Sequence, residues 1–150
     1  MPQPVPDQLD QGLKPFVGSW SCEGKESLPG MPEFSYKSSV KNKWDLANFW
    51  MSIHYTRAKT KTTPAFEATA FWGYDNMMKK FIYVGLDSWG GHLHATSAGP
   101  QGNSISWDGE ASAMGQGMPI KFSVTRDDKG HGLNFSMESN GQKIFEDTCK

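Results

Sequence analysis

The sequence is poor in leucine and rich in aromatic residues. Its 150 residues include seven Leu against nineteen aromatics, with sixteen Gly and nine Pro spread along the chain. Because strong helix formers are scarce and aromatic residues favour strands, the composition favours a β-rich fold over a helical bundle. A chain of this length buries roughly two-thirds of its unfolded surface, which is enough for the core of one domain.

An excess of charge of either sign is also missing. Fifteen Lys and Arg stand against sixteen Asp and Glu, and the basic residues are scattered. This balance gives no electrostatic footprint for phosphate backbones or anionic lipid, so nucleic acid and membrane surfaces are not expected partners. No apolar run approaches about 18 residues, which excludes a membrane-spanning helix.

Cysteine is nearly absent. Cys22 and Cys149 lie far apart and form neither a C-x-x-C nor a zinc-knuckle spacing, so a cysteine-ligated metal is not expected. Two interpretations are open, namely two unrelated buried thiols or one disulfide that joins the first strand to the last. The first six residues form a polar, proline-rich stub like one left after leader removal. We therefore expect a periplasmic or secreted protein, with a cytoplasmic location as the alternative.

Two-residue alternation of polar and apolar side chains dominates after residue 18. In 34–44 it places Phe34, Tyr36, Val40 and Trp44 on one face and lysines on the other, which predicts a strand with one solvated face. Before this region a short helix is expected over 7–13, with Asp7 as its N-cap. The expected strands are 19–25, 34–44, 49–57, 65–74, 80–87, 91–98, 103–111, 119–126, 132–138 and 142–149.

Turn signals separate these strands, the strongest being Asn140-Gly141. The pattern predicts an all-β, antiparallel up-and-down barrel of about 8–10 strands, or a sandwich, in one domain over 7–150 after the stub 1–6. Closing the barrel removes the sheet edges and pairs the first strand with the last. Because Cys22 shares the inward face with Trp20, a disulfide to Cys149 at this seam is predicted.

Short motifs near the start and middle of the chain resemble a known family. A helical turn followed by Gly18-Ser19-Trp20 resembles the Gly-x-Trp signature of the lipocalins and their calycin relatives. The stretch 13–24, together with 71–75 (Phe-Trp-Gly-Tyr-Asp), is similar to a bacterial family of lipocalin-like proteins catalogued as a domain of unknown function. The resemblance implies a barrel around an apolar cavity, with Trp20 plugging its floor, and supplies no catalytic residues.

The inward aromatic and methionine side chains either fill the barrel or line a cavity for a small apolar or aromatic ligand. We expect a binding protein, monomeric or homodimeric, with loops near residues 27–33, 59–64 and 87–91 at the mouth. The predicted ligand-binding residues are Tyr36, Phe66, Trp72, Tyr74, Tyr83, Trp107, Phe122, Phe135, Met137, His54 and His94.

The sequence does not specify the register of the strands that carry His54, His92 and His94, so the face on which each side chain lies is undetermined. A one-residue shift within 46–57 or 80–98 exchanges His54 for Tyr55, or His94 for Leu93, on the inner face. His92 and His94 share a face and are weak metal candidates, which need a third ligand to converge with them. An inward His54 or His94 is also a candidate axial ligand for haem. No cofactor is expected otherwise.

Enzyme motifs are missing as well. The chain has no G-x-x-x-x-G-K-[ST], G-x-G-x-x-G, G-x-S-x-G or H-E-x-x-H pattern. The alternative function does not depend on these motifs. It is an isomerase, lyase or cyclase that uses inward polar residues, with Asp87, Tyr83, His54 or Arg126 as candidates. This alternative requires at least two titratable groups to meet inside the barrel.

Overall fold

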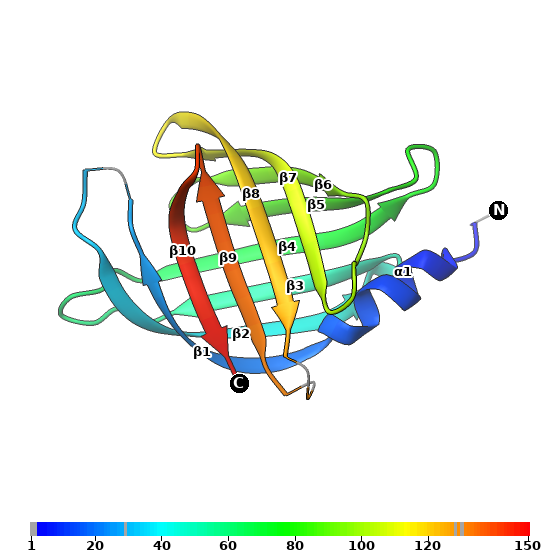
Figure 1. Ribbon diagram of the computed structural model, residues 1–150, viewed down its shortest axis with the longest axis horizontal. Coiled ribbons are helices and arrows are strands. Elements are labelled where there is room, and N and C mark those ends of the chain that lie inside the picture. Colours follow the sequence, from blue (N-terminus) through cyan, green and yellow to red (C-terminus); the bar gives the residue numbers. More distant parts are fainter. Residues whose placement is uncertain (1–2, 29, 128, 130) are drawn as a thin grey trace.

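The protein is a ten-stranded antiparallel barrel with a short N-terminal helix, as the alternation predicted (Figure 1). The computed structural model describes residues 3–28, 30–127, 129 and 131–150, so Met1 and Pro2 of the expected stub lie outside the described residues. The helices are α1 (Asp7–Leu13) and the 3₁₀ turns η1 (Lys14–Phe16) and η2 (Leu46–Asn48). The strands are β1 (Gly18–Glu26), β2 (Phe34–Asp45), β3 (Trp50–Arg57), β4 (Phe66–Asp75), β5 (Lys80–Asp87), β6 (His92–Ser97), β7 (Ser104–Ala113), β8 (Gln116–Arg126), β9 (Leu133–Ser139) and β10 (Gln142–Cys149).

Each strand pairs with its neighbours in sequence, and β1 pairs with β10 to close the sheet. Cys22 and Cys149 are direct partners at this seam and form a disulfide, with their Cα atoms 4.0 Å apart. Ser21 and Lys150 exchange both backbone hydrogen bonds beside them. Cys22 and Cys149 are therefore a non-hydrogen-bonded pair, whose side chains lie closest together. The predicted disulfide is confirmed.

The N-terminal segment covers one end of the barrel. Leu9 and Leu13 of α1 are fully buried, and the Phe16 ring packs against Trp72 with ring centres 5.9 Å apart. Asn42 of β2 donates a hydrogen bond of 2.9 Å to the Phe16 carbonyl. The expected N-cap is wrong by one residue, because Pro6 occupies that position without a side-chain cap. Among the described residues, no helix is long and apolar enough to cross a membrane.

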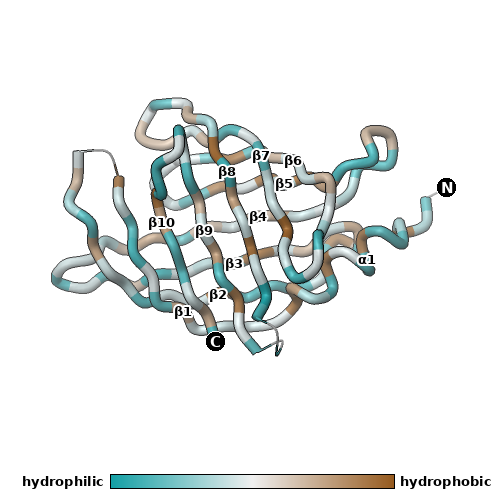
Figure 2. The backbone as a smooth tube through the Cα atoms, viewed as in Figure 1, coloured by the Kyte–Doolittle hydropathy of each residue, from teal (hydrophilic) through white to brown (hydrophobic). Residues whose placement is uncertain are grey.

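Hydrophobic and hydrophilic positions alternate along the strands (Figure 2). The alternation in β1 and β2 follows the predicted faces, with Cys22, Tyr36 and Val40 buried. In β3, where the sequence left the register open, Met51 is fully buried, Tyr55 is partly buried and His54 is exposed. The open register is thus resolved with Tyr55 inward.

Candidate functional site

The α1 segment closes one end of the barrel, and we call the half at the other end the open half. The barrel contains a cavity because small side chains face inward in this open half. Ala70 of β4 pairs with Gly85 of β5, Gly85 pairs with Leu93 of β6, and Leu93 pairs with Ala111 of β7. Across these four strands, Leu93 is the one residue of the row with a branched side chain. The next row toward the closed end begins with the large pair Trp72 and Tyr83. The small row leaves a cavity of about 220 Å³ that opens opposite α1.

Six of the predicted ligand-binding residues line this cavity. They come from five strands, and the rings of Tyr83 and Phe122 meet edge to face with their centres 5.7 Å apart. The six residues are Tyr36, Phe66, Tyr83, Phe122, Phe135 and Met137. Their placement agrees with the alternation, because each one is inward and lies in the open half of the barrel.

Three other predicted residues face inward but pack in the closed half. Trp72 and Trp107 are fully buried, with ring centres 4.9 Å apart, and Tyr74 packs against Phe81. None of the three is among the cavity-lining residues. Alternation specifies which face a side chain occupies but not its depth along the barrel axis, and this is why the sequence grouped them with the lining.

The predicted ligand-binding roles of His54 and His94 do not match their positions. Both side chains are exposed, and His54 Nε2 lies 3.1 Å from Glu67 Oε1 on the outer surface. His94 pairs in register with Glu110 of β7 while Leu93 faces inward. His92 is exposed at the cavity mouth. Across the described ranges, no group of three His, Cys, Asp or Glu is placed to hold a metal ion.

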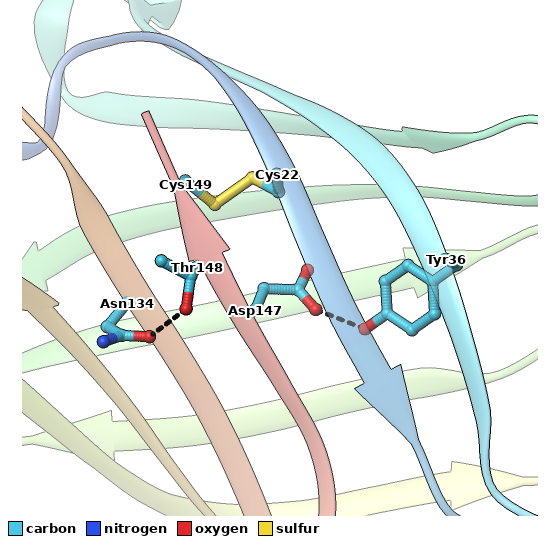
Figure 3. The surroundings of a disulfide bond; sticks show 6 residues. All are labelled: Cys22, Tyr36, Asn134, Asp147, Thr148 and Cys149. Carbon is cyan, nitrogen blue, oxygen red and sulfur yellow. Dashed lines mark hydrogen bonds between the residues drawn. A yellow bond between two sulfur atoms is a disulfide. The ribbon is translucent and has the colours of Figure 1, made fainter.

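A buried polar cluster occupies one wall of the cavity, at the β10–β1–β2 seam. Asp147, Gly24 and Tyr36 lie in one register across these three strands. The Tyr36 hydroxyl donates a hydrogen bond to Asp147 Oδ1, and the two side chains meet over β1 (Figure 3). A Cβ on Gly24 would overlap Asp147 Oδ1 and lie 2.7 Å from the Tyr36 hydroxyl oxygen. The missing side chain of Gly24 therefore makes room for this hydrogen bond.

Burial perturbs the titration of this cluster. It raises the pKa of Asp147 above its ordinary value of 3.8, because the charged carboxylate loses hydration, while hydrogen bonding from Tyr36 and Tyr55 and the charge of Arg57 oppose the increase. Burial likewise raises the pKa of Tyr36 and of Tyr55 well above their ordinary value of 10.0. Both phenols stay protonated at neutral pH, so Tyr36 keeps the O–H that it donates to Asp147.

Arg57, the last residue of β3, adds a buried ion pair to the same wall. Its Nη1 donates to Glu26 Oε2 at 2.5 Å, and its Nε donates to the Pro64 carbonyl at 3.2 Å. The guanidinium carbon lies 4.7–5.5 Å from four ring centres, which belong to Phe34, Tyr36, Phe66 and Trp89. Cation–π contacts and the ion pair thus hold this buried charge in place.

Two polar atoms of the wall have no hydrogen-bond partner among the described residues. They are Arg57 Nη2 and Asp147 Oδ2. Arg57 is 3% exposed and Asp147 is 0% exposed, and both line the cavity. Buried polar groups in folded proteins are normally paired, so these two atoms are exceptions within the wall that call for an explanation.

Sequence reasoning missed Asp147, Glu26, Arg57 and Tyr55 as site residues. For the first two a signal was present, because counting back by two from the inward Cys149 gives Asp147, and counting on from Cys22 gives Gly24 and then Glu26. Arg57 follows in the same way once Tyr55 is known to face inward. The register of β3, which only the tertiary structure specifies, was the missing information.

A family model identifies the family to which this chain belongs. Residues 5–143 match the model of the family described as protein of unknown function DUF1579. The chain belongs to this family. The resemblance inferred from the short motifs is therefore confirmed. The description of the family assigns no activity to its members. No curated protein matches the chain.

This DUF1579 protein is also similar in fold to solved structures. The crystal structure of Rv2717c from M. tuberculosis superposes with a TM-score of 0.69 at 14% sequence identity. The match covers 94% of this chain and 95% of the other. At this level of identity the likeness shows a shared barrel architecture.

Proposed function

We propose that this protein binds a small, mainly apolar molecule in the open half of its barrel. The observation that supports this most directly is the cavity of about 220 Å³, lined largely by aromatic, aliphatic and methionine side chains around a few polar groups. Ligand sites in proteins commonly combine an apolar lining with a few convergent polar groups. The lining at the mouth includes Leu86, Trp89 and Met114, which are partly or largely exposed.

The test uses the neutral probe N-phenyl-1-naphthylamine, whose fluorescence increases in apolar sites. We expect a saturable increase with the wild-type protein and a loss of that increase in Ala70→Phe, because Ala70 lines the cavity and is 4% exposed. Ala58→Phe is the matched control, since Ala58 is exposed in the β3–β4 loop. No saturable increase with the folded wild-type protein, or equal signals from the two variants, would contradict the proposal.

A second candidate is an enzyme that uses the same cavity, such as an isomerase, lyase or cyclase. The hydrogen bond between Tyr36 and Asp147 favours it, because two titratable groups meet inside the barrel. Asp147 is then the candidate proton acceptor for a bound molecule. NMR of a molecule that binds should show its conversion by the wild-type protein and none by Asp147→Asn. A bound molecule that stays unchanged would count against catalysis.

The disulfide also supports an exported location, periplasmic or secreted, since structural disulfides persist mainly in oxidising compartments. Fractionation of cells that make the protein natively would test this. Recovery in the cytoplasmic fraction with reduced thiols would contradict it.

A further inference from the structure

The polar wall of the cavity contains one donor and one acceptor that are buried and unpaired among the described residues. Arg57 Nη2 is a donor and Asp147 Oδ2 an acceptor, and both are buried without a partner among the described residues. A hydroxyl group can donate and accept at the same time, so a single chemical group can satisfy both kinds of atom. Leaving either atom unpaired in an apolar site costs free energy, which favours a ligand that supplies the missing partner.

The charge of the wall opposes an anionic ligand. Arg57 is already paired with Glu26, and the cavity lining also includes the carboxyl groups of Asp87 and Asp147. Apart from His92, Arg57 is the one basic side chain among the described lining residues. A carboxylate ligand would therefore lose its hydration without meeting a net positive field, whereas a neutral hydroxyl loses far less.

The size of the cavity limits the apolar part of the ligand. About 220 Å³ lies below the roughly 300–1,000 Å³ typical of pockets for drug-sized molecules. The lining includes the flat rings of Tyr83, Phe122 and Phe135 and the flexible Met118 and Met137. These features suit a flat molecule of up to about three rings.

We propose that the cavity selects a small apolar alcohol or phenol, bound through its hydroxyl group to Asp147 and Arg57, over the corresponding carboxylate. This inference rests on the proposed binding function and specifies its ligand class.

The decisive experiment displaces N-phenyl-1-naphthylamine at pH 7 with three probes that share one ring system, 2-naphthol, 2-naphthoate and naphthalene. We expect 2-naphthol to bind about tenfold more tightly than either of the others, as one additional hydrogen bond predicts. Equal or tighter binding of 2-naphthoate would overturn the inference. This comparison needs no variant, so it stands even if a substitution at the wall prevents folding.

Removing the charge that neutralises Arg57 should change the preference. In Glu26→Gln the guanidinium loses its partner charge, and we expect 2-naphthoate to bind about tenfold more tightly than to the wild-type protein. Glu23→Gln is the control, because Glu23 is exposed on the outer face of the same strand. An unchanged naphthoate affinity in folded Glu26→Gln would overturn the role given to the ion pair.

The outcomes separate this inference from the binding function. If the fluorescent probe binds and the three competitors displace it equally, the binding function stands and the hydroxyl selectivity is wrong. If neither the probe nor any competitor binds the folded wild-type protein, both are wrong.

Discussion

Single residues determine whether the polar wall can exist. Asp147 and Tyr36 lie on strands that are not adjacent, with β1 between them, and their side chains meet because Gly24 has no Cβ. In most antiparallel strands an inward side chain at the middle position would separate its two neighbours. The hydrogen bond at this wall is thus a consequence of one glycine at a position where a side chain would collide with both partners.

The substitution Gly24→Ala tests this. A methyl group would displace Asp147 and Tyr36 and break their hydrogen bond, so we expect the free energy of unfolding to fall by about 1–3 kcal/mol. Urea denaturation measures the change. The control is Gly117→Ala in β8, where a Cβ would meet no atom within 4 Å. Equal stability of the two variants would contradict the role of Gly24.

The raised pKa of Asp147 predicts a pH dependence of stability. A carboxyl whose pKa is higher in the folded than in the unfolded state binds its proton more tightly when folded. Its contribution to stability therefore falls as the pH increases from the ordinary value of 3.8 through the folded pKa. Asparagine does not titrate, so the wild-type free energy of unfolding minus that of Asp147→Asn should decrease by at most about 1.4 kcal/mol per pH unit.

Urea denaturation of both proteins between about pH 4 and 8 measures this difference. Asp108→Asn, which removes an exposed carboxyl from the outer face of β7, is the matched control. An increase of the difference with pH would contradict the raised pKa.

At the scale of elements, the seam between β1 and β10 carries both the closure of the barrel and the polar wall. Cys149 and Asp147 are two residues apart on β10 and share its inward face, so the disulfide fixes the register in which Asp147 meets Gly24 (Figure 3). The bridge joins residues separated by 127 positions and so restricts nearly the whole unfolded chain.

Removal of the disulfide should lower the free energy of unfolding by about 4–5 kcal/mol according to the loop-entropy model. The measurement compares denaturation of the oxidised protein with that of the reduced protein and of the double variant Cys22→Ser/Cys149→Ser. Titration of the unreduced, denatured protein should find no free thiol. Two free thiols, or an unchanged transition after reduction, would contradict this prediction.

The whole molecule divides into a filled end and an open end. Toward α1 the interior is occupied by Phe16, Trp72 and Trp107, while the row from Ala70 to Ala111 leaves space at the other end. The same two-residue alternation identifies the inward positions in both halves. It does not show whether an inward residue, tryptophan or alanine, lies in the filled half or in the open half. The depth of each residue along the barrel axis, which depends on strand tilt and pairing, separates packing from cavity lining.

The amino-acid sequence alone was enough to predict the strands, the short helix and, as the favoured alternatives, a closed barrel with a disulfide at its seam. These follow from two-residue alternation, turn residues and the need to remove sheet edges, all of which act over short stretches or depend on topology alone. The three-dimensional structure was needed to show that Tyr55 rather than His54 faces inward and that Trp72 packs in the core. It also brought together Glu26, Arg57 and Asp147, because these residues come from three strands and their meeting depends on register between strands, which a shift of one residue reverses.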